Sequence, residues 1–298
     1  MDKKKLSISD LEKMEYYDFM SYMGVPFFHI GGPRSTEELA GFCSIGKNSK
    51  VLMVGCGSGF SACHLAKKTG CFVVGVDIAR VSVEKARQRA INEDVEELTL
   101  FITGDAYKLP FRKASFDVVI TEFVSQFLDK DKAFSEFIRV LKPGGYAGIN
   151  ELYMDAVMDP DLKIKINEAE NIFTEVTGLP FRINTPEEWQ SYFERAGFTD
   201  VNLHKRRPFQ NAGDSIATIK AIGGVTNIAF MMLNLLKYML FSKKLRKRFL
   251  QLDKGKRILF NRKSTRQHVG YILGTARKPH YILNFTVSRI PVSASLLL

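Results

Sequence analysis

The chain has 298 residues, of which 45% are hydrophobic, so it can bury a substantial core and is not a disordered protein. Its four cysteines show no CxxC spacing, which favours free thiols over a disulfide framework or a metal site. The first ten residues are charged and lack an apolar core. We therefore expect no signal peptide and a cytoplasmic location.

Positive charge is concentrated in one segment of the chain. The formal net charge is +11, and residues 237–266 hold twelve Lys or Arg against the single acid Asp253. The remaining residues contain equal numbers of basic and acidic side chains, so they are balanced overall. Such a basic segment can attract a membrane surface, a nucleic acid or an acidic substrate.

Hydrophobic periodicity divides the chain into three parts. Helical spacing predicts a helix at 9–23, ended by Gly24 and Pro26, and a second at 36–43, so residues 1–46 form an expected N-terminal helical cap. Strands and helices then alternate through an expected main domain, residues 47–278, and residues 279–298 form a tail. The expected strands are 50–54, 71–76, 98–102, 116–121, 146–152, 199–205 and 268–276, and the expected helices between them are 60–68, 81–91, 132–141, 160–176 and 186–195.

This alternation predicts an α/β fold of the Rossmann-like, doubly wound type, with a mostly parallel sheet of about seven strands. Right-handed crossovers bring the carboxyl ends of the first four strands to one edge of the sheet. Gly55, Asp77, Asp105 and Glu122 follow those strand ends, so the edge that they share is the expected site.

Residues 207–266 interrupt the alternation and are expected to form a helical lid over the acceptor site. Residues 221–241 are nearly long enough to span a bilayer, but Asn234 and Lys237 interrupt them and they connect two strands of one sheet, which argues against a span. We expect the Met- and Leu-rich stretch 230–236 to supply an apolar wall. The alternative is peripheral contact with a membrane through this helix and the basic run Lys243 to Arg248.

A glycine-rich turn follows the first expected strand, in Val51 to Gly59. Gly55, Gly57 and Gly59 let the backbone turn tightly and approach a ligand, and the helix that follows offers free N–H groups to an anion. Dinucleotide enzymes need a glycine one position later, where this chain has Phe60, so the spacing disfavours NAD.

Acidic residues follow the next two strands. Asp77 can accept two hydrogen bonds from a ribose diol, although an aspartate that stood alone at this position would more often be a solvated loop residue. Asp105, in Gly104-Asp105-Ala106, can accept from an adenine amino group, although a lone Gly-Asp is a common turn.

Taken in order, VLMVGCGSG, GVDIA, GDAYKLPF, FDVVI and LKPGG resemble the class I S-adenosylmethionine-dependent methyltransferases of the small-molecule type. The resemblance implies S-adenosylmethionine as methyl donor and assigns roles to residues along the site edge. Its methionine part would lie on Gly55, Cys56, Gly57 and Gly59, its ribose on Asp77, its adenine near Ile78, Asp105 and Ala106, and its sulfonium beside Thr121 and Glu122.

Two features of the resemblance concern the amino-acid end of the cofactor. The family usually has an acid where this chain has Met53, and that acid helps to hold the amino group of the cofactor. The segment 28–32, which contains His29, resembles one that folds over the cofactor in some relatives. A relative that binds the cofactor without turnover therefore stays an alternative.

The expected reaction is in-line displacement of the methyl group onto a small, amphiphilic or lipid-like acceptor. A general base is needed only if the acceptor loses a proton, and the candidates are Glu122, Glu151 and His29. An RNA-modifying enzyme that uses the basic insertion is the other alternative. Nucleic acid is the less favoured partner, because Thr121-Glu122-Phe123-Val124 stands where amino-methylating nucleic-acid enzymes carry an Asn-Pro-Pro-Tyr-like motif.

Overall fold

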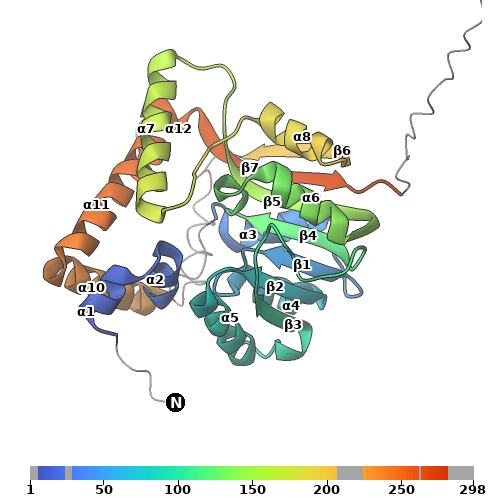
Figure 1. Cartoon of the computed structure of the whole chain (residues 1–298), viewed down its shortest axis with the longest axis horizontal. Helices are drawn as coiled ribbons and strands as arrows, with labels where there is room; N and C mark the ends of the chain where they lie inside the picture. Colours follow the sequence, from blue (N-terminus) through green and yellow to red (C-terminus); the bar gives the residue numbers. More distant parts are fainter. Residues whose placement is uncertain (1–5, 24–28, 207–223, 262, 281–298) are drawn as a thin grey trace, which may run out of the picture.

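The computed structural model describes residues 6–23, 29–206, 224–261 and 263–280. Seven strands form one sheet in the order β3-β2-β1-β4-β5-β7-β6 (Figure 1). Strands β1 to β5 are all parallel to one another, whereas β7 runs antiparallel to both β5 and β6. The predicted Rossmann-like, mostly parallel sheet is therefore confirmed. The strands are β1 Lys50–Val54, β2 Phe72–Asp77, β3 Thr99–Thr103, β4 Phe116–Glu122, β5 Leu141–Met154, β6 Thr199–Arg206 and β7 Val269–Arg277.

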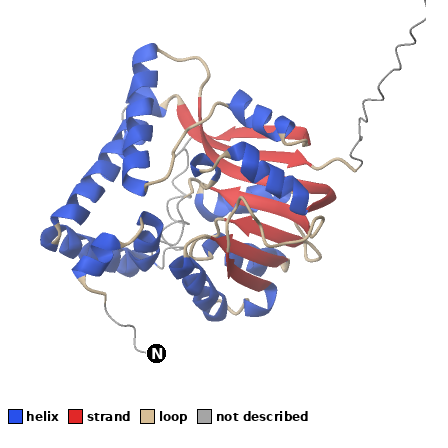
Figure 2. Cartoon of the chain, viewed as in Figure 1, coloured by secondary structure: helices blue, strands red, loops and turns tan. Residues whose placement is uncertain are grey.

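Helices cover both faces of this sheet (Figure 2). On one face, α3 (Gly32–Phe42), α4 (Phe60–Thr69) and α5 (Arg80–Asn92) pack over a core of small and aliphatic side chains. On the other, α6 (Lys130–Val140) and α8 (Pro186–Arg195) supply an aromatic core that includes Phe134, Phe137, Trp189 and Phe193. The expected N-terminal cap is thus divided, because α3 packs on the sheet and only the two preceding helices lie beyond it.

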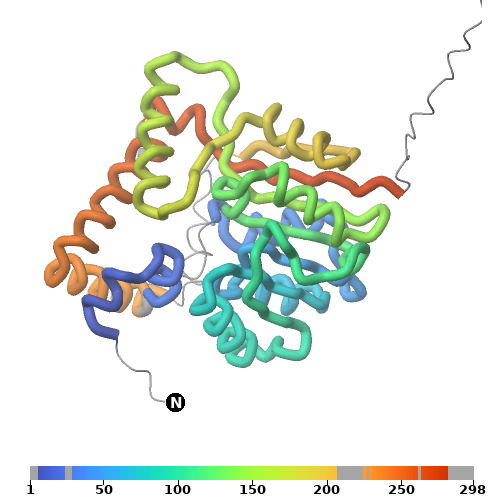
Figure 3. Tube along the Cα trace, in the orientation of Figure 1, coloured from blue at the N-terminus to red at the C-terminus, as the bar shows by residue number. Residues whose placement is uncertain are grey.

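A further group of helices stands beyond the carboxyl ends of the parallel strands. It contains α1 (Ile8–Lys13), α2 (Tyr16–Met23), α7 (Pro160–Thr177), α10 (Gly224–Phe241), α11 (Lys243–Lys256) and α12 (Lys263–Arg266). Short helical turns lie at Glu96–Leu98, Ser125–Phe127 and Arg257–Asn261. Helices α7 and α11 run side by side over much of their length (Figure 3). These helices close the edge where the predicted site residues lie.

Two predicted boundaries are wrong for local reasons. The single helix expected at 9–23 is two helices, because Met14 has an extended backbone (φ −64°, ψ 140°) that ends α1. The strand expected at 146–152 is the much longer β5, which begins where Leu141 leaves the helical conformation. Leu141 already pairs with Phe116 of β4, so pairing with the neighbouring strand overrides the turn signal of Pro143-Gly144-Gly145.

We expect Gly59→Ala to destabilise the fold. Gly59 has φ +77°, and a Cβ there would lie 2.7 Å from the Cβ of Ala86, where α4 meets α5. The loss combines about 1 kcal/mol of left-handed strain with about 1–3 kcal/mol of overpacking. Gly70→Ala is the matched control, since Gly70 has φ +72° but its Cβ would meet only Lys47 at 3.5 Å. Urea denaturation should show the larger loss for Gly59→Ala, and equal losses would contradict the packing argument.

Candidate functional site

A cavity of about 220 Å³ opens at the carboxyl ends of β1, β2 and β4. It collects side chains from the expected glycine loop, from the ends of three strands and from α2, which is distant in sequence. The lining combines apolar and aromatic side chains with the carboxylates of Asp77, Asp105 and Glu122. It consists of Tyr17, Ser21, Val54, Gly55, Gly57, Val76, Asp77, Ile78, Ser82, Gly104, Asp105, Ala106, Tyr107, Glu122, Phe123, Val124, Phe127, Leu128 and Leu179.

The three loop glycines do different things. Gly55 has φ +69°, and a Cβ on it would lie 2.4 Å from Cγ2 of Val124, so it permits close packing of two loops. Gly59 is the N-cap of α4, and its missing side chain lets α4 pack closely on Ala86 of α5, so Gly59 does not face the cavity. Gly57 has φ +53°, and a Cβ there would meet no protein atom within 4 Å. Gly57 therefore leaves an open cradle on the cavity wall, where a side chain would compete only with a ligand.

Asp77 joins the end of β2 to the glycine loop. Its Oδ2 accepts a 2.7 Å hydrogen bond from the amide of Gly57, and its Oδ1 accepts one of 2.9 Å from the amide of Ala79. Burial raises the pKa of the Asp77 carboxyl, and these two backbone hydrogen bonds oppose that rise. Each carboxylate oxygen can accept a further hydrogen bond. Asp77 thus both fixes the loop and presents acceptors to the cavity.

The rim beyond Asp77 is open to solvent. Ile78 is 72% exposed although it is a large apolar residue, and it lines the cavity together with Ala106. Asp105 is exposed, and its Oδ1 accepts a 2.9 Å hydrogen bond from the amide of Tyr107 within a tight turn. These residues form a flat, partly apolar rim beside a carboxylate, which suits a planar heterocycle.

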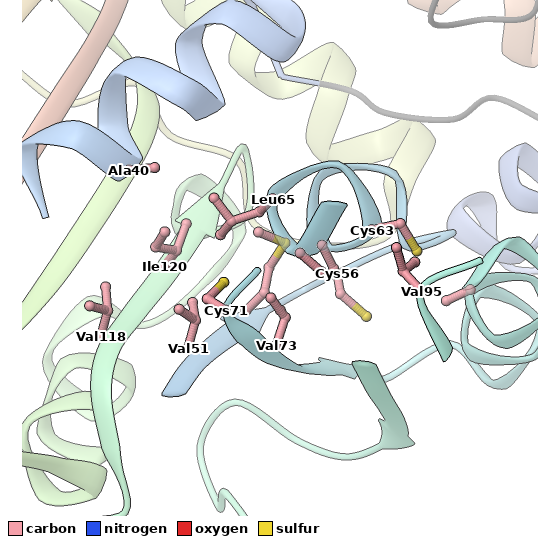
Figure 4. Close-up of a cluster of buried hydrophobic side chains, with 14 of the residues drawn as sticks. Ala40, Val51, Cys56, Cys63, Leu65, Cys71, Val73, Val95, Val118 and Ile120 are labelled. Carbon is pink, nitrogen blue, oxygen red and sulfur yellow. The ribbon is translucent and has the colours of Figure 1, made fainter. Parts of the chain in front are cut away.

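Besides Gly59, two further residues expected at the cofactor do not line the cavity. The amide of Cys56 donates to the carbonyl of Val76 at 3.0 Å, and its thiol lies among the core side chains under α4 (Figure 4). Burial raises the pKa of that thiol well above its usual range. Thr121 is 1% exposed, and its Oγ1 bonds to Oε1 of Glu151 and Oγ of Ser125. Both residues support the loops from behind.

The turn after β4 is strained and is held by the carboxylate of Glu151. Phe123 has φ +59°, which is unfavourable for an aromatic residue, and its amide donates to the carbonyl of Asn150 at 2.8 Å. Oε1 of Glu151 accepts from the amides of Val124 (3.1 Å) and Ser125 (2.8 Å). Glu151 itself is buried and does not line the cavity. The structure therefore makes Glu151 a positioning residue and does not support its expected role as a base.

The other two base candidates, Glu122 and His29, contact each other, and of the two only Glu122 lines the cavity. Glu122 lines the cavity, its Oε1 accepts a 2.8 Å hydrogen bond from Thr36, and its Oε2 lies 3.6 Å from Nε2 of His29. That Oε2 is buried and has no hydrogen bond within the described residues. His29 lies deeper, where Ser61 and Asn150 approach its two ring nitrogens at 3.2 Å. Of the segment 28–32, Phe28 lies outside the described residues.

The apolar part of the cavity lining was not predicted from the sequence. It includes Phe123, Phe127, Leu128 and Leu179 together with Tyr17 of α2. The ring of Phe127 packs 5.6 Å from that of Tyr17. These residues come from three separate segments, and apolar residues in loops and helix faces give no periodic signal that distinguishes a ligand wall from core.

The predicted lid does not form this wall. Within the described residues, the cavity lining takes nothing from 224–261 or from 263–266, and residues 207–223 lie outside the described chain. Phe230, Leu233 and Leu236 are 54–66% exposed to solvent. The reason is that α10 packs on α2, with Tyr238 against Phe19, and α2 itself takes the place next to the cavity.

Comparison with known proteins agrees with this arrangement. A family model described as a methyltransferase domain matches residues 52–149. Methyltransferase GfsG of Streptomyces halstedii is 37% identical over 181 residues, which cover 59% of this chain and 63% of that protein. The 27-O-demethylrifamycin SV methyltransferase of Amycolatopsis mediterranei is 28% identical over 190 residues, covering 61% and 67% of the two chains.

More distant likenesses extend the comparison. Sterol 24-C-methyltransferase ERG6B of Gibberella zeae is 37% identical over 129 residues, covering 43% of this chain and 34% of that protein. The chain thus spans between one third and two thirds of the length of these three relatives. The structure of Haemonchus contortus phosphoethanolamine N-methyltransferase 2 with S-adenosylmethionine superimposes with a TM-score of 0.62 at 19% identity, covering 94% and 61% of the two chains, and shows the shared fold.

We expect Glu151→Gln to gain stability over the wild type as the pH rises. Burial raises the pKa of Glu151 from 4.5 to about 7, so between these values the unfolded chain releases its proton first and wild-type stability falls. Above the folded pKa the loss is complete, at about 3 kcal/mol from about 1.4 kcal/mol per pKa unit. The difference in free energy of unfolding, variant minus wild type, should therefore rise across this window in urea titrations. A flat or falling difference would contradict a buried Glu151 carboxyl.

Proposed function

The chain belongs to the class I S-adenosylmethionine-dependent methyltransferases, and on that premise we propose that it methylates a small amphiphilic acceptor. The observation that carries the proposal is the mixed lining of a single cavity. The glycine loop and the carboxylate of Asp77 share that lining with the apolar side chains of Phe123, Phe127 and Leu179. An acceptor with an apolar body suits these side chains, because its burial releases water from them.

The glycine loop and the acidic residues of the cavity fit the methyl donor. Gly57 leaves a cradle that a Cβ would fill, Asp77 presents carboxylate oxygens, and Ile78 and Asp105 border the open rim. We assign these residues to the methionine part, the ribose and the adenine in that order. When bound there, S-adenosylmethionine supplies a methyl group that its sulfonium already activates.

Glu122 is assigned to the amino group of the donor. The first strand of this family usually carries an acid for that group, but here Met53 is 2% exposed and packs in the core. Glu122 ends the neighbouring strand β4, which pairs with β1, and it lines the cavity with a buried oxygen that has no hydrogen bond in the described chain. A buried carboxylate of this kind needs a positive partner. The ammonium of the donor provides one.

Around the reacting atoms the chain binds and orients the donor and the acceptor, and it excludes water. Positioning and desolvation can account for much of the rate of methyl transfer. The strained turn at Phe123 directs the aromatic wall, and Glu151 holds that turn in place. Glu122 is the base candidate that lines the cavity, and His29 contacts it from the protein side, so His29 can act on an acceptor hydroxyl only through Glu122. Relatives named for rifamycin and sterol methylation support an apolar acceptor.

The donor assignment is tested with Gly57→Ala. The new methyl group should occupy the cradle and lower affinity for S-adenosylhomocysteine at least about tenfold in isothermal titration, while the fold is kept. Gly70→Ala carries comparable backbone strain far from the cavity and should bind as the wild type does. NAD should bind neither protein. Unchanged affinity in a folded Gly57→Ala protein would overturn the assignment of this loop.

The acceptor class is tested with labelled donor. Cell extract incubated with wild-type protein and methyl-labelled S-adenosylmethionine should yield label in the solvent-extracted lipid fraction, and the Gly57→Ala protein should yield little. Label confined to RNA or to precipitated protein would overturn the proposed acceptor class. Because donor binding is measured separately, such a result would leave the methyltransferase assignment intact.

We expect Glu122→Gln to weaken binding of both S-adenosylmethionine and S-adenosylhomocysteine, since both carry the same ammonium. The loss should be about 1.5–3 kcal/mol, as for hydrogen bonds to charged groups. Glu37→Gln, which changes a partly exposed carboxylate on α3, is the matched control and should bind normally. If affinity is unchanged and only the turnover rate falls, Glu122 is a base rather than a ligand of the ammonium.

A further inference from the structure

Helix α10 exposes the side that a soluble helix normally keeps polar. Val225, Phe230, Met232, Leu233, Leu236, Leu240 and Phe241 are each 54–71% exposed. Its inner side is occupied, since Tyr238 packs on Phe19 of α2. Of the described helices, α10 alone is long and apolar enough to cross a bilayer by composition. A continuous outward apolar stripe of this size marks an interaction surface.

Positive charge lies directly beside this stripe. Helix α11 follows α10 after Ser242, and one of its faces forms an open groove lined by Lys243, Arg246, Lys247, Leu250, Gln251 and Lys254. Lys254 is paired with Glu168, whereas Lys243, Arg246 and Lys247 stand on the first turns of α11, nearest to α10. Leu250 is 56% exposed within this basic face, so apolar and cationic side chains alternate there.

We propose that α10 and α11 form a docking surface for the face of an anionic lipid bilayer, with α10 lying in the interface plane. Apolar side chains would enter the acyl boundary while the cations of α11 meet lipid phosphates. A second copy of the chain would instead bring two cationic α11 faces together. A nucleic acid would leave the apolar stripe of α10 uncovered.

The connectivity and packing also favour an in-plane helix over a span. The chain passes from β6 through α10 and α11 to β7, and these two strands are hydrogen-bonded neighbours in one sheet. Helix α10 packs along one side on α2 and α11, which belong to the body of the protein. A helix fixed in this way can present its outer side to a bilayer without leaving the fold.

Docking would bring the cavity close to the lipid. Helix α2 has two functional sides: Phe19 packs on Tyr238 of α10 and on Phe249 of α11, while Tyr17 and Ser21 line the cavity. Helix α10 and then α2 thus lie between the bilayer surface and the site, and an amphiphilic acceptor delivered from the bilayer would reach the cavity past these two helices. The delivery of an acceptor from the bilayer rests on the proposed function, whereas the docking of α10 and α11 on the bilayer does not.

The experiment measures cosedimentation of the full chain with vesicles. Binding is expected with vesicles of phosphatidylcholine containing about 30% phosphatidylglycerol and should be weak with phosphatidylcholine alone or in high salt. The triple variant Lys243→Gln, Arg246→Gln, Lys247→Gln should lower partitioning on the order of a hundredfold, at about 1 kcal/mol per charge. The matched triple variant Lys67→Gln, Arg112→Gln, Lys113→Gln removes the same charge elsewhere and should bind normally.

The apolar stripe is tested separately. Leu233→Gln with Leu236→Gln should reduce vesicle binding, whereas Ile91→Gln with Ile164→Gln, at equally exposed helix positions, should not. The two triple variants and the two double variants should all keep their affinity for S-adenosylhomocysteine. This measurement checks the fold and keeps the test independent of the acceptor.

Four results would overturn the proposal. The first is equal binding to neutral and anionic vesicles, and the second is resistance to carbonate extraction, which a membrane-spanning helix would show. The third is a dimer that dissociates when Leu233 and Leu236 are changed to Gln. The fourth is RNA binding that these two changes leave intact in a protein that does not bind vesicles.

Discussion

The hydrogen bonds from the amides of Val124 and Ser125 to the Glu151 carboxylate are the contacts on which the site depends. They hold the turn that follows β4, in which Phe123 has a left-handed backbone. Val124 in turn packs against Gly55, so the same turn sets the position of the glycine loop. A buried carboxyl with a raised pKa is therefore retained for the geometry that it imposes on its neighbours.

Burying that carboxyl costs stability, and the surrounding groups compensate for part of the cost. Thr121 donates to the same oxygen as the two amides, and Glu151 is almost inaccessible to solvent. Strain at Phe123 and desolvation at Glu151 meet in the wall of the cavity, where function can make use of both. The rest of the sheet is conventional, with aliphatic packing on one face and aromatic packing on the other.

Of the helices beyond the sheet, α2 lines the cavity, whereas the described residues of α10 and α11 do not. The cavity residues proposed to hold the donor come from the loops after β1, β2 and β3, all within the segment that matches the methyltransferase family. The residues proposed to face the acceptor come from the turn after β4, from the segment after α7 and from α2. Helices α10 and α11 contribute to neither group in the described chain, and they support α2 from outside. Their unusual exposed surface thus needs an explanation outside the cavity.

The sequence by itself determined the seven strands, their mostly parallel arrangement and several of the loop residues that line the cavity. Gly57, Asp77 and Asp105 were predictable because each follows a strand directly, and parallel strands end at one edge. Only the tertiary structure decided which side chains face the cavity. Cys56 and Thr121 turn into the protein, while Tyr17 arrives from a helix far away in the chain. The presence of each strand follows from local hydrophobic pattern, but the exposure of a side chain depends on what packs against it, and no local pattern records that.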